Sequence, residues 1–181
     1  MKLLRAKYRE QVLATGELWR KNEASRRMFI DHILTTCIAA NKENDKSKAD
    51  LLCVPVKKVD SSDGEATGTA DYVVTMGSRM VIVIEAKKCD MEHALRQNFA
   101  AMEVARVLNG KRRHQDSQDG GWHDIQGICM DYQNWIFVKR SSKEFATKHM
   151  SCRTPETLDH DPLDFPSDMI PIANRVYTKL L

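Results

Sequence analysis

The chain has 181 residues, 42% of them hydrophobic, and a net charge of +3; that length allows one domain with a substantial core, and that charge permits a nucleic-acid partner without requiring one. No apolar run approaches the roughly 20 residues that a membrane span needs, so no membrane association is expected. The five cysteines are odd in number and form no C-x-x-C pair, which indicates reduced thiols in an intracellular compartment, nucleus or cytoplasm, rather than a disulfide framework or a zinc knuckle.

The first clear helical pattern covers residues 22–38, where apolar side chains recur at the spacing of one helix face. Glu23 lies at its start, in the first turn. An acid is favourable there because the amino end of a helix carries partial positive charge. The polar residues 41–48 that follow predict a loop.

Three strands are predicted next, and together they begin a sheet. Residues 51–59 form the first, and Pro55 within it favours a position at the edge of the sheet. Residues 68–75 and 80–88 are rich in β-branched side chains, and the turn residues Gly77 and Ser78 lie between them. This arrangement predicts a β-hairpin.

Each strand of this hairpin carries an acid where polarity is least expected. Asp71 lies near the start of the first strand, and Glu85 directly follows the apolar run Val81–Ile84 of the second. Because side chains alternate along a strand, Glu85 and Lys87 point to the same face. The pair could be an exposed salt bridge, but an ionisable group at the end of a buried strand is costly unless it is paired or bound to a metal. We therefore favour a functional site.

The residues of this hairpin are the parts that metal-assisted phosphodiester hydrolysis needs. Asp71 lies on the strand next to Glu85 and can approach the same point. Two carboxylates suit a hard divalent cation such as Mg²⁺ (or Mn²⁺). A lysine beside them, Lys87, can hold or deprotonate a water molecule.

The spacing of Asp71, fourteen positions before Glu85, and then Ala86 and Lys87 resembles the PD-(D/E)XK nuclease superfamily, which has the restriction-endonuclease-like fold. Ala70 stands where that superfamily usually has proline. The resemblance covers about residues 17–140 by the order of elements. It implies an α/β fold with a mixed central β-sheet flanked by helices, and a Mg²⁺-dependent endonuclease acting on nucleic acid. DNA is favoured over RNA as the substrate, but the sequence leaves the choice open. A homodimer is left open.

The same resemblance implies roles for individual residues. Asp71, Glu85 and the carbonyl group of Ala86 would ligate the metal, and Lys87 would orient the attacking water. Glu23 on the first helix would be accessory, although its place in the first turn explains it equally well.

A second long helix is predicted from about residue 91 to 108, with Asp90 as its cap. Gln97 lies on this helix, and the resemblance gives it an accessory place near the site; the alternative is a polar residue that faces solvent. Beyond it, Lys111, Arg112 and Arg113 form a basic cluster within a polar stretch that is expected to be irregular. These cations could contact phosphates or could simply be solvated.

The last part of the chain is predicted to complete the sheet and then wrap around it. Residues 125–130 and 135–138 read as two strands, in which Tyr132 and Trp135 could stack on bases but fit packing better. Four of the five prolines fall between residues 141 and 171, which indicates an extended segment before a final short helix. The expected organisation is a single domain with its core at about 17–140 and a C-terminal wrap and helix at 141–181.

Two further possibilities remain open. The same fold can serve as a catalytically inactive nucleic-acid-binding or protein-interaction module. The turn ending at Asp71, the strand end at Glu85 and the hairpin around Tyr132 are also similar to eukaryotic effector nuclease domains of the Crinkler type.

Overall fold

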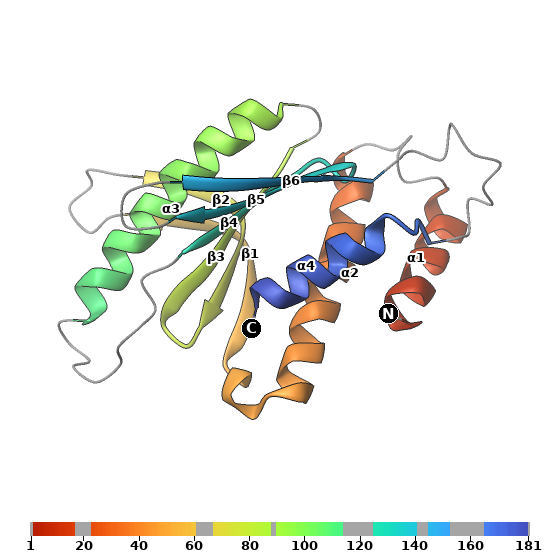
Figure 1. Cartoon of the computed structure of the whole chain (residues 1–181), viewed down its shortest axis with the longest axis horizontal. Coiled ribbons are helices and arrows are strands. Elements are labelled where there is room, and N and C mark those ends of the chain that lie inside the picture. The colour runs from red at the N-terminus through yellow and green to blue at the C-terminus, as the bar shows by residue number, and fades with distance from the viewer. Residues whose placement is uncertain are drawn as a thin grey trace. The chain divides into compact units, whose positions relative to one another are not determined.

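The structure is a computed structural model, which describes residues 2–16, 23–60, 67–87, 90–113, 125–140, 145–152 and 165–180. Over these ranges the chain forms four α-helices, a short 3₁₀ helix and a six-stranded sheet (Figure 1). The elements are α1 (Lys2–Thr15), α2 (Glu23–Asn44), η2 (Lys46–Lys48), β1 (Leu51–Asp60), β2 (Thr67–Met76), β3 (Arg79–Ala86), α3 (Met91–Arg113), β4 (Gln126–Met130), β5 (Asn134–Arg140), β6 (Phe145–Ser151) and α4 (Met169–Lys179). The predicted mixed α/β class is confirmed.

The strands lie in the sheet in the order in which they occur in the chain, from β1 to β6. β1, β2 and β3 are antiparallel, and β4 joins β3 in parallel, so the sheet is mixed. The predicted hairpin closes through Gly77 and Ser78, and Gly77 has a φ of +58°, a conformation that glycine adopts without steric cost. Pro55 lies in the edge strand β1, as predicted, because an edge position leaves its missing N–H group unneeded.

The described chain divides into two compact units. Residues 50–130 and 136–149 make the sheet unit, which contains α3 and most of the strands. Residues 1–49, 131–135 and 150–181 make the helical unit, which contains α1, α2 and α4.

In the sheet unit, α3 (green in Figure 1) packs along one face of the sheet against β2, β3 and β4. Asp90 caps the helix as predicted, since its Oδ1 accepts a hydrogen bond of 2.8 Å from the backbone N–H of His93. The helix then continues to Arg113, five residues beyond the predicted end at 108. The shared core is apolar, and its buried members are Ala70, Val73, Met80, Val83, Ala94, Ala101, Met102, Val104, Ala105, Ile125, Cys129, Ile136 and Val138.

In the helical unit, α2 lies between α1 and α4. An aromatic edge-to-face contact joins α1 to α2, with the ring centroids of Tyr8 and Phe29 5.3 Å apart. Phe29 makes a second such contact with Tyr132, between β4 and β5, at 5.5 Å. Trp135 is fully buried and donates from Nε1 to the carbonyl oxygen of Tyr132, so packing explains both aromatic residues. None of the described helices has the length and apolar character needed to span a membrane.

The prediction of a loop at 41–48 was wrong, because α2 continues to Asn44. Asn41 is fully buried, and its Nδ2 donates to the carbonyl oxygens of Cys37 and of Tyr177 in α4. A polar residue that bonds to a neighbouring helix can extend a helix where local composition favours a loop.

The strand β6 was also missed, since 141–171 was expected to be extended wrapping without a strand. Phe145 anchors its start, because the ring packs 4.4 Å from that of Phe99 on α3 and lies under the guanidinium of Arg140 at 5.5 Å. These contacts are made with other elements, so the residue pattern of the strand itself does not predict them.

Candidate functional site

Strands β2 and β3 pair from the turn as far as Tyr72 and Ile84, where their ladder ends. Beyond this point each strand has a different neighbour. The first half of β2 stays paired with β1, and the end of β3 pairs in parallel with β4. The strands therefore separate at a fork, which we define by the next residue on each strand, Asp71 on β2 and Glu85 on β3.

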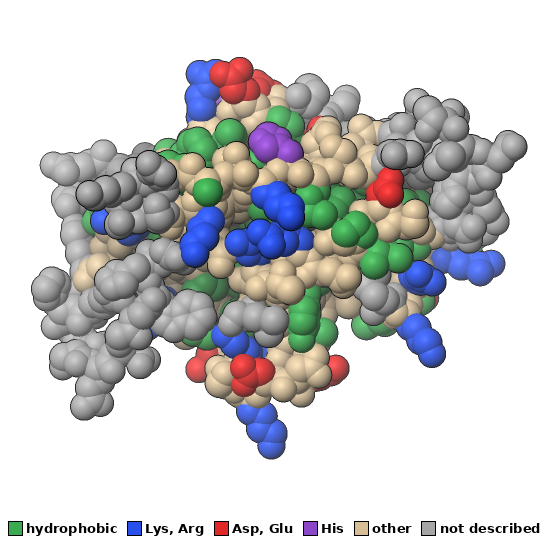
Figure 2. Space-filling model, viewed as in Figure 1, with side chains coloured by type: hydrophobic (Ala, Val, Ile, Leu, Met, Phe, Trp, Pro, Cys, Tyr) green, Lys and Arg blue, Asp and Glu red, His purple; other side chains and the backbone are tan. Residues whose placement is uncertain are grey.

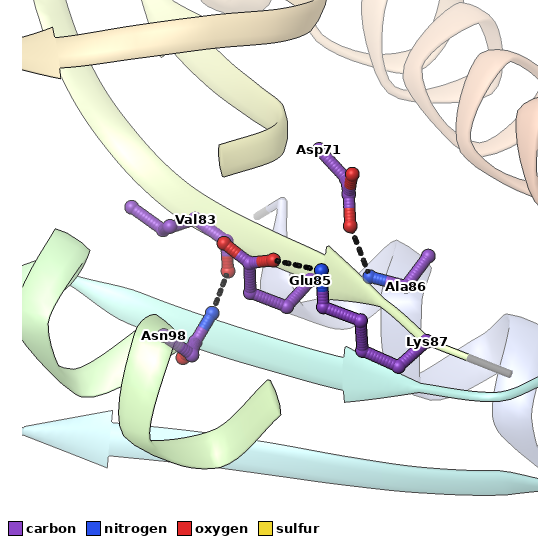
Figure 3. Close-up of polar contacts among 6 residues, drawn as sticks. All are labelled: Asp71, Val83, Glu85, Ala86, Lys87 and Asn98. Atoms are coloured by element: carbon purple, nitrogen blue, oxygen red, sulfur yellow. Dashed lines mark hydrogen bonds and ion pairs between the residues drawn. The ribbon is translucent and has the colours of Figure 1, made fainter. Parts of the chain in front are cut away.

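Asp71 bridges the fork with its side chain. Its Oδ2 accepts a hydrogen bond of 2.8 Å from the backbone N–H of Ala86, the last residue of β3 (Figure 3). The carboxylate thus takes the place of a backbone acceptor where the ladder has ended. Asp71 is the fifth of the ten residues of β2, and the first half of this strand is held by pairing with β1.

An irregularity in β1 lies level with Asp71. The pairing of β1 with β2 is interrupted at Val56, which lies between the paired residues Pro55 and Lys57 and has a φ of 45°. A β-branched residue in this left-handed region costs about 1–2 kcal/mol. At the level of Asp71, the pairing with β1 is therefore interrupted and the ladder with β3 has ended. Backbone strain and bulges of this kind are common beside functional sites.

Glu85 is buried, with 1% of its side chain exposed, and Lys87 lies beside it with 29% exposed. The Nζ atom of Lys87 is 3.8 Å from Oε2 of Glu85, which confirms that the two side chains share a face (Figure 3). The backbone N–H of Lys87 donates to the carbonyl oxygen of Met130 at 2.8 Å, which holds the end of β3 against β4. The alternative of a fully exposed salt bridge does not fit a buried carboxylate.

Cys129 of β4 pairs in register with Glu85 and is fully buried. Burial, and then the negative charge of Glu85, raise the pKa of the Cys129 thiol to about 12. The thiol therefore stays protonated at physiological pH. It is thus a neutral neighbour of the Glu85 carboxylate.

Gln97 lies on α3 and is half-buried. Its Oε1 atom is buried and has no hydrogen-bond donor within the part of the chain that the structure describes. Over these residues, the Oε1 atom accepts no hydrogen bond from Lys87 or from the backbone at the fork. An amide oxygen left in this state calls for a donor from outside the described residues, such as water or a ligand.

The neighbouring residue Asn98 makes the contact with β3 instead, and the sequence analysis missed it. Asn98 is fully buried, and its Nδ2 donates 2.8 Å to the carbonyl oxygen of Val83, two residues before Glu85 (Figure 3). The signal was available, because Asn98 lies four residues from both Ala94 and Met102, on the apolar stripe of the helix.

The side chains of the remaining predicted residues lie outside what the structure describes. Glu23 begins α2 in the helical unit, and its side chain is not among those described. The side chains of residues 111–113 are likewise outside the description, although their backbone forms the last turn of α3 rather than the irregular segment expected. Figure 2 shows Lys and Arg side chains in small groups on one described face, with hydrophobic side chains between them.

The side chains of Glu85 and Lys87 thus lie together at the end of β3, as the strand alternation predicted, and Asp71 is bonded to the backbone N–H between them. Over the described residues, no group of three or more His, Cys, Asp or Glu side chains is arranged to hold a metal ion. The site therefore offers two carboxylates and one ammonium group. No protein-family model matches this chain, and no curated protein matches it.

Proposed function

We propose that this protein is a metal-dependent nuclease of the restriction-endonuclease-like type, which hydrolyses phosphodiester bonds with DNA as the favoured substrate. One observation carries the proposal. Asp71 is hydrogen-bonded to the backbone between Glu85 and Lys87, so an acid of β2 is fixed to the end of β3 that carries an acid and a lysine. The resemblance in the spacing of these residues supports the same assignment.

The donor set suits a hard divalent cation. Asp71 and Glu85 would hold Mg²⁺ or Mn²⁺ through carboxylate oxygens, with the carbonyl oxygen of Ala86 as a further donor, and oxygen ligands are the ones these ions prefer. The ion would supply positive charge that stabilises the charge developing on the phosphate group. Burial of Glu85 supports this use, because a buried carboxylate gains most from a nearby cation.

Lys87 would orient the attacking water. Its ammonium group lies next to Glu85 and its side chain is 29% exposed, so it can contact both the carboxylate and a solvent molecule entering the fork. A positioned donor beside the reacting water lowers the barrier by holding the nucleophile in line and favouring its deprotonated form. Gln97 would be accessory, and its buried Oε1 could accept a hydrogen bond from such a water.

The test is cleavage of labelled plasmid, single-stranded DNA and RNA with Mg²⁺ or Mn²⁺. The variants are Glu85→Ala, Lys87→Ala and, as a matched control, Glu92→Ala. Glu92 is an exposed acid of the sheet unit whose partner is Arg96 on the same helix. We expect metal-dependent cleavage in the wild type and in Glu92→Ala, and its loss in the other two. Cleavage that survives in Glu85→Ala would refute the proposal.

The second candidate is a nucleic-acid-binding module that has no nuclease activity. Two observations favour it. The described residues hold no cluster of three metal-binding side chains, and the carboxylate of Asp71 already accepts a backbone hydrogen bond. DNA binding that persists in EDTA, with no cleavage under either metal and no effect of Glu85→Ala on binding, would establish this candidate.

A further inference from the structure

Two asparagines of α3 bond to the backbone of the same strand. Asn98 donates to the carbonyl oxygen of Val83 at 2.8 Å. Asn109, three turns later, donates to the carbonyl oxygen of Met80 at 2.8 Å and accepts from its backbone N–H at 3.1 Å. The helix is therefore fastened to β3 at two points, one near the hairpin turn and one near the fork.

The two attachments differ in how well the amide is satisfied. Asn109 uses both its donor and its acceptor on Met80. Asn98 uses only its donor, and its Oδ1 is buried without a hydrogen-bond donor over the described residues. A leucine of similar shape would avoid that unpaired oxygen. A buried polar group that is only half satisfied points to a role beyond packing.

The side-chain oxygen of Asn98 occupies the space beside Gly127 of the neighbouring strand β4. A Cβ atom added at Gly127 of β4 would lie 1.9 Å from Oδ1 of Asn98 and 2.6 Å from Sδ of Met102, so any other residue there would displace these two side chains. Gly127 pairs in register with Val83. The single amide of Asn98 thus touches both strands at one level of the parallel pair β3–β4.

The next pair of residues on the same face of β3 and β4 belongs to the candidate site. Glu85 follows Val83 by two residues, and its register partner Cys129 follows Gly127 by two. Since alternate residues share a face, Asn98 lies one step behind the buried carboxylate, on the face that α3 covers. A shift of the Val83–Gly127 step would move the carboxylate of Glu85 relative to Asp71.

We propose that Asn98 is a positioning residue for Glu85: by clamping the Val83–Gly127 step of β3 and β4, its amide holds the buried carboxylate at the fork. This inference rests on the proposed function for its catalytic meaning, but the geometry it claims is testable without any metal. The matched control is Asn109, which bonds to the same strand from the same helix at the far end.

The experiment compares Asn98→Leu with Asn109→Leu in two readouts, with Asn98→Ala as a smaller substitution should leucine not be accommodated. The first readout is amide hydrogen exchange of the metal-free protein. Asn98→Leu should speed exchange at Ala86, whose N–H is bonded to Asp71, and leave Met80 unchanged; Asn109→Leu should do the reverse. Loss of stability alone would move both amides in both variants.

The second readout is Mn²⁺ binding by titration calorimetry. Asn98→Leu should weaken it by about 10–100-fold, the usual effect of removing a group that orients a metal ligand, while Asn109→Leu leaves it unchanged. Gly127→Ala should reproduce the Asn98 phenotype, and the double variant Asn98→Ala/Gly127→Ala should be no worse than either single one, because both act on one contact.

The outcomes separate the two ideas. If the wild type binds no Mn²⁺ but Asn98→Leu still loosens Ala86 alone, the nuclease proposal fails and the positioning role stands. If the wild type binds Mn²⁺ and cuts DNA, and Asn98→Leu changes neither binding nor exchange at Ala86, the positioning role is overturned and the nuclease proposal stands. Equal effects of Asn98→Leu and Asn109→Leu at both amides would mean that Asn98 only attaches the helix to the strand. That result would also overturn the positioning role.

Discussion

The two ends of β3 satisfy their backbone hydrogen-bonding groups in different ways. At the hairpin end, the strand turns through Gly77 and Ser78, and Asn109 satisfies both backbone groups of Met80. At the fork, the antiparallel ladder stops, and the backbone N–H of Ala86 is satisfied by the side chain of Asp71 instead. One end is closed by neutral groups, and the other by charged ones.

This difference separates what folding needs from what a site needs. A neutral amide completes a strand end at little electrostatic cost, as Asn109 does. A buried glutamate does not, because the charge must leave water and is offset only by good partners. The charges at the fork are therefore better explained by function than by stability, and substitutions at the two ends should separate the two properties.

The largest effect is expected from Glu85→Gln. Metal-dependent cleavage should fall by at least about 100-fold, since groups that merely orient a metal ligand are already worth about 10–100-fold. The free energy of unfolding should stay the same or rise, because a neutral amide of equal size replaces a buried charge. Cleavage rates and urea denaturation measure the two, with Glu92→Gln as the control. If Glu85→Gln were strongly destabilised, the charge of Glu85 would instead be needed for the stability of the fold.

Substitutions of Asp71 should change both the free energy of unfolding and the cleavage activity. Asp71→Ala leaves the buried N–H of Ala86 without its acceptor and should lower the free energy of unfolding by about 1–3 kcal/mol. Asp71→Asn keeps an oxygen at that position and should cost less. Both variants lose the carboxylate, so both should lose cleavage. Urea denaturation and cleavage assays decide this, and equal destabilisation by the two substitutions would mean that the hydrogen bond to Ala86 contributes little.

Asn109→Ala tests the neutral end. It removes both hydrogen bonds to Met80 and should lower the free energy of unfolding by about 1–3 kcal/mol, with no change in cleavage at temperatures where the protein stays folded. Denaturation followed by circular dichroism gives the stability. A loss of cleavage in the folded variant would show that the two ends of β3 are coupled, contrary to the comparison.

Much of the fork followed from the sequence because strand geometry is local. Alternation along β3 placed Glu85 and Lys87 on one face, and the short turn at Gly77 brought Asp71 alongside them. The cap at Asp90 followed in the same way, from a residue type at a defined position. Each of these inferences needed only neighbours within a few residues or across one hairpin.

The parts that could not be predicted depend on contacts between distant elements. The bond from Asn98 to Val83 joins a helix to a strand fifteen residues earlier, and strand periodicity says nothing of it. Asn41 extends α2 through a bond to α4, 136 residues away. β6 forms although its side chains are largely exposed, because Phe145 packs on Phe99. Tertiary contacts override local preference in all three cases.

The smallest expected effect concerns Cys129, which faces Glu85 at the fork. Its thiol pKa is about 12 in the folded protein against a usual value of 9.0, chiefly because of burial and secondarily because of the charge of Glu85. Between these two pH values the unfolded chain loses the thiol proton while the folded chain keeps it. The stabilisation is therefore present below pH 9 and is lost as the pH rises toward 12.

Cys129→Ala should flatten this alkaline decline in the free energy of unfolding, and Glu85→Gln should flatten it only slightly, since burial remains. Cys152 provides the control in the helical unit, because burial first and Asp168 second raise its thiol pKa to about 12 as well. Denaturation midpoints between pH 8 and pH 11 measure these two variants and the control variant Cys152→Ala. A larger effect from Glu85→Gln than from Cys129→Ala would mean that the charge of Glu85, and not burial, dominates the electrostatics of the fork.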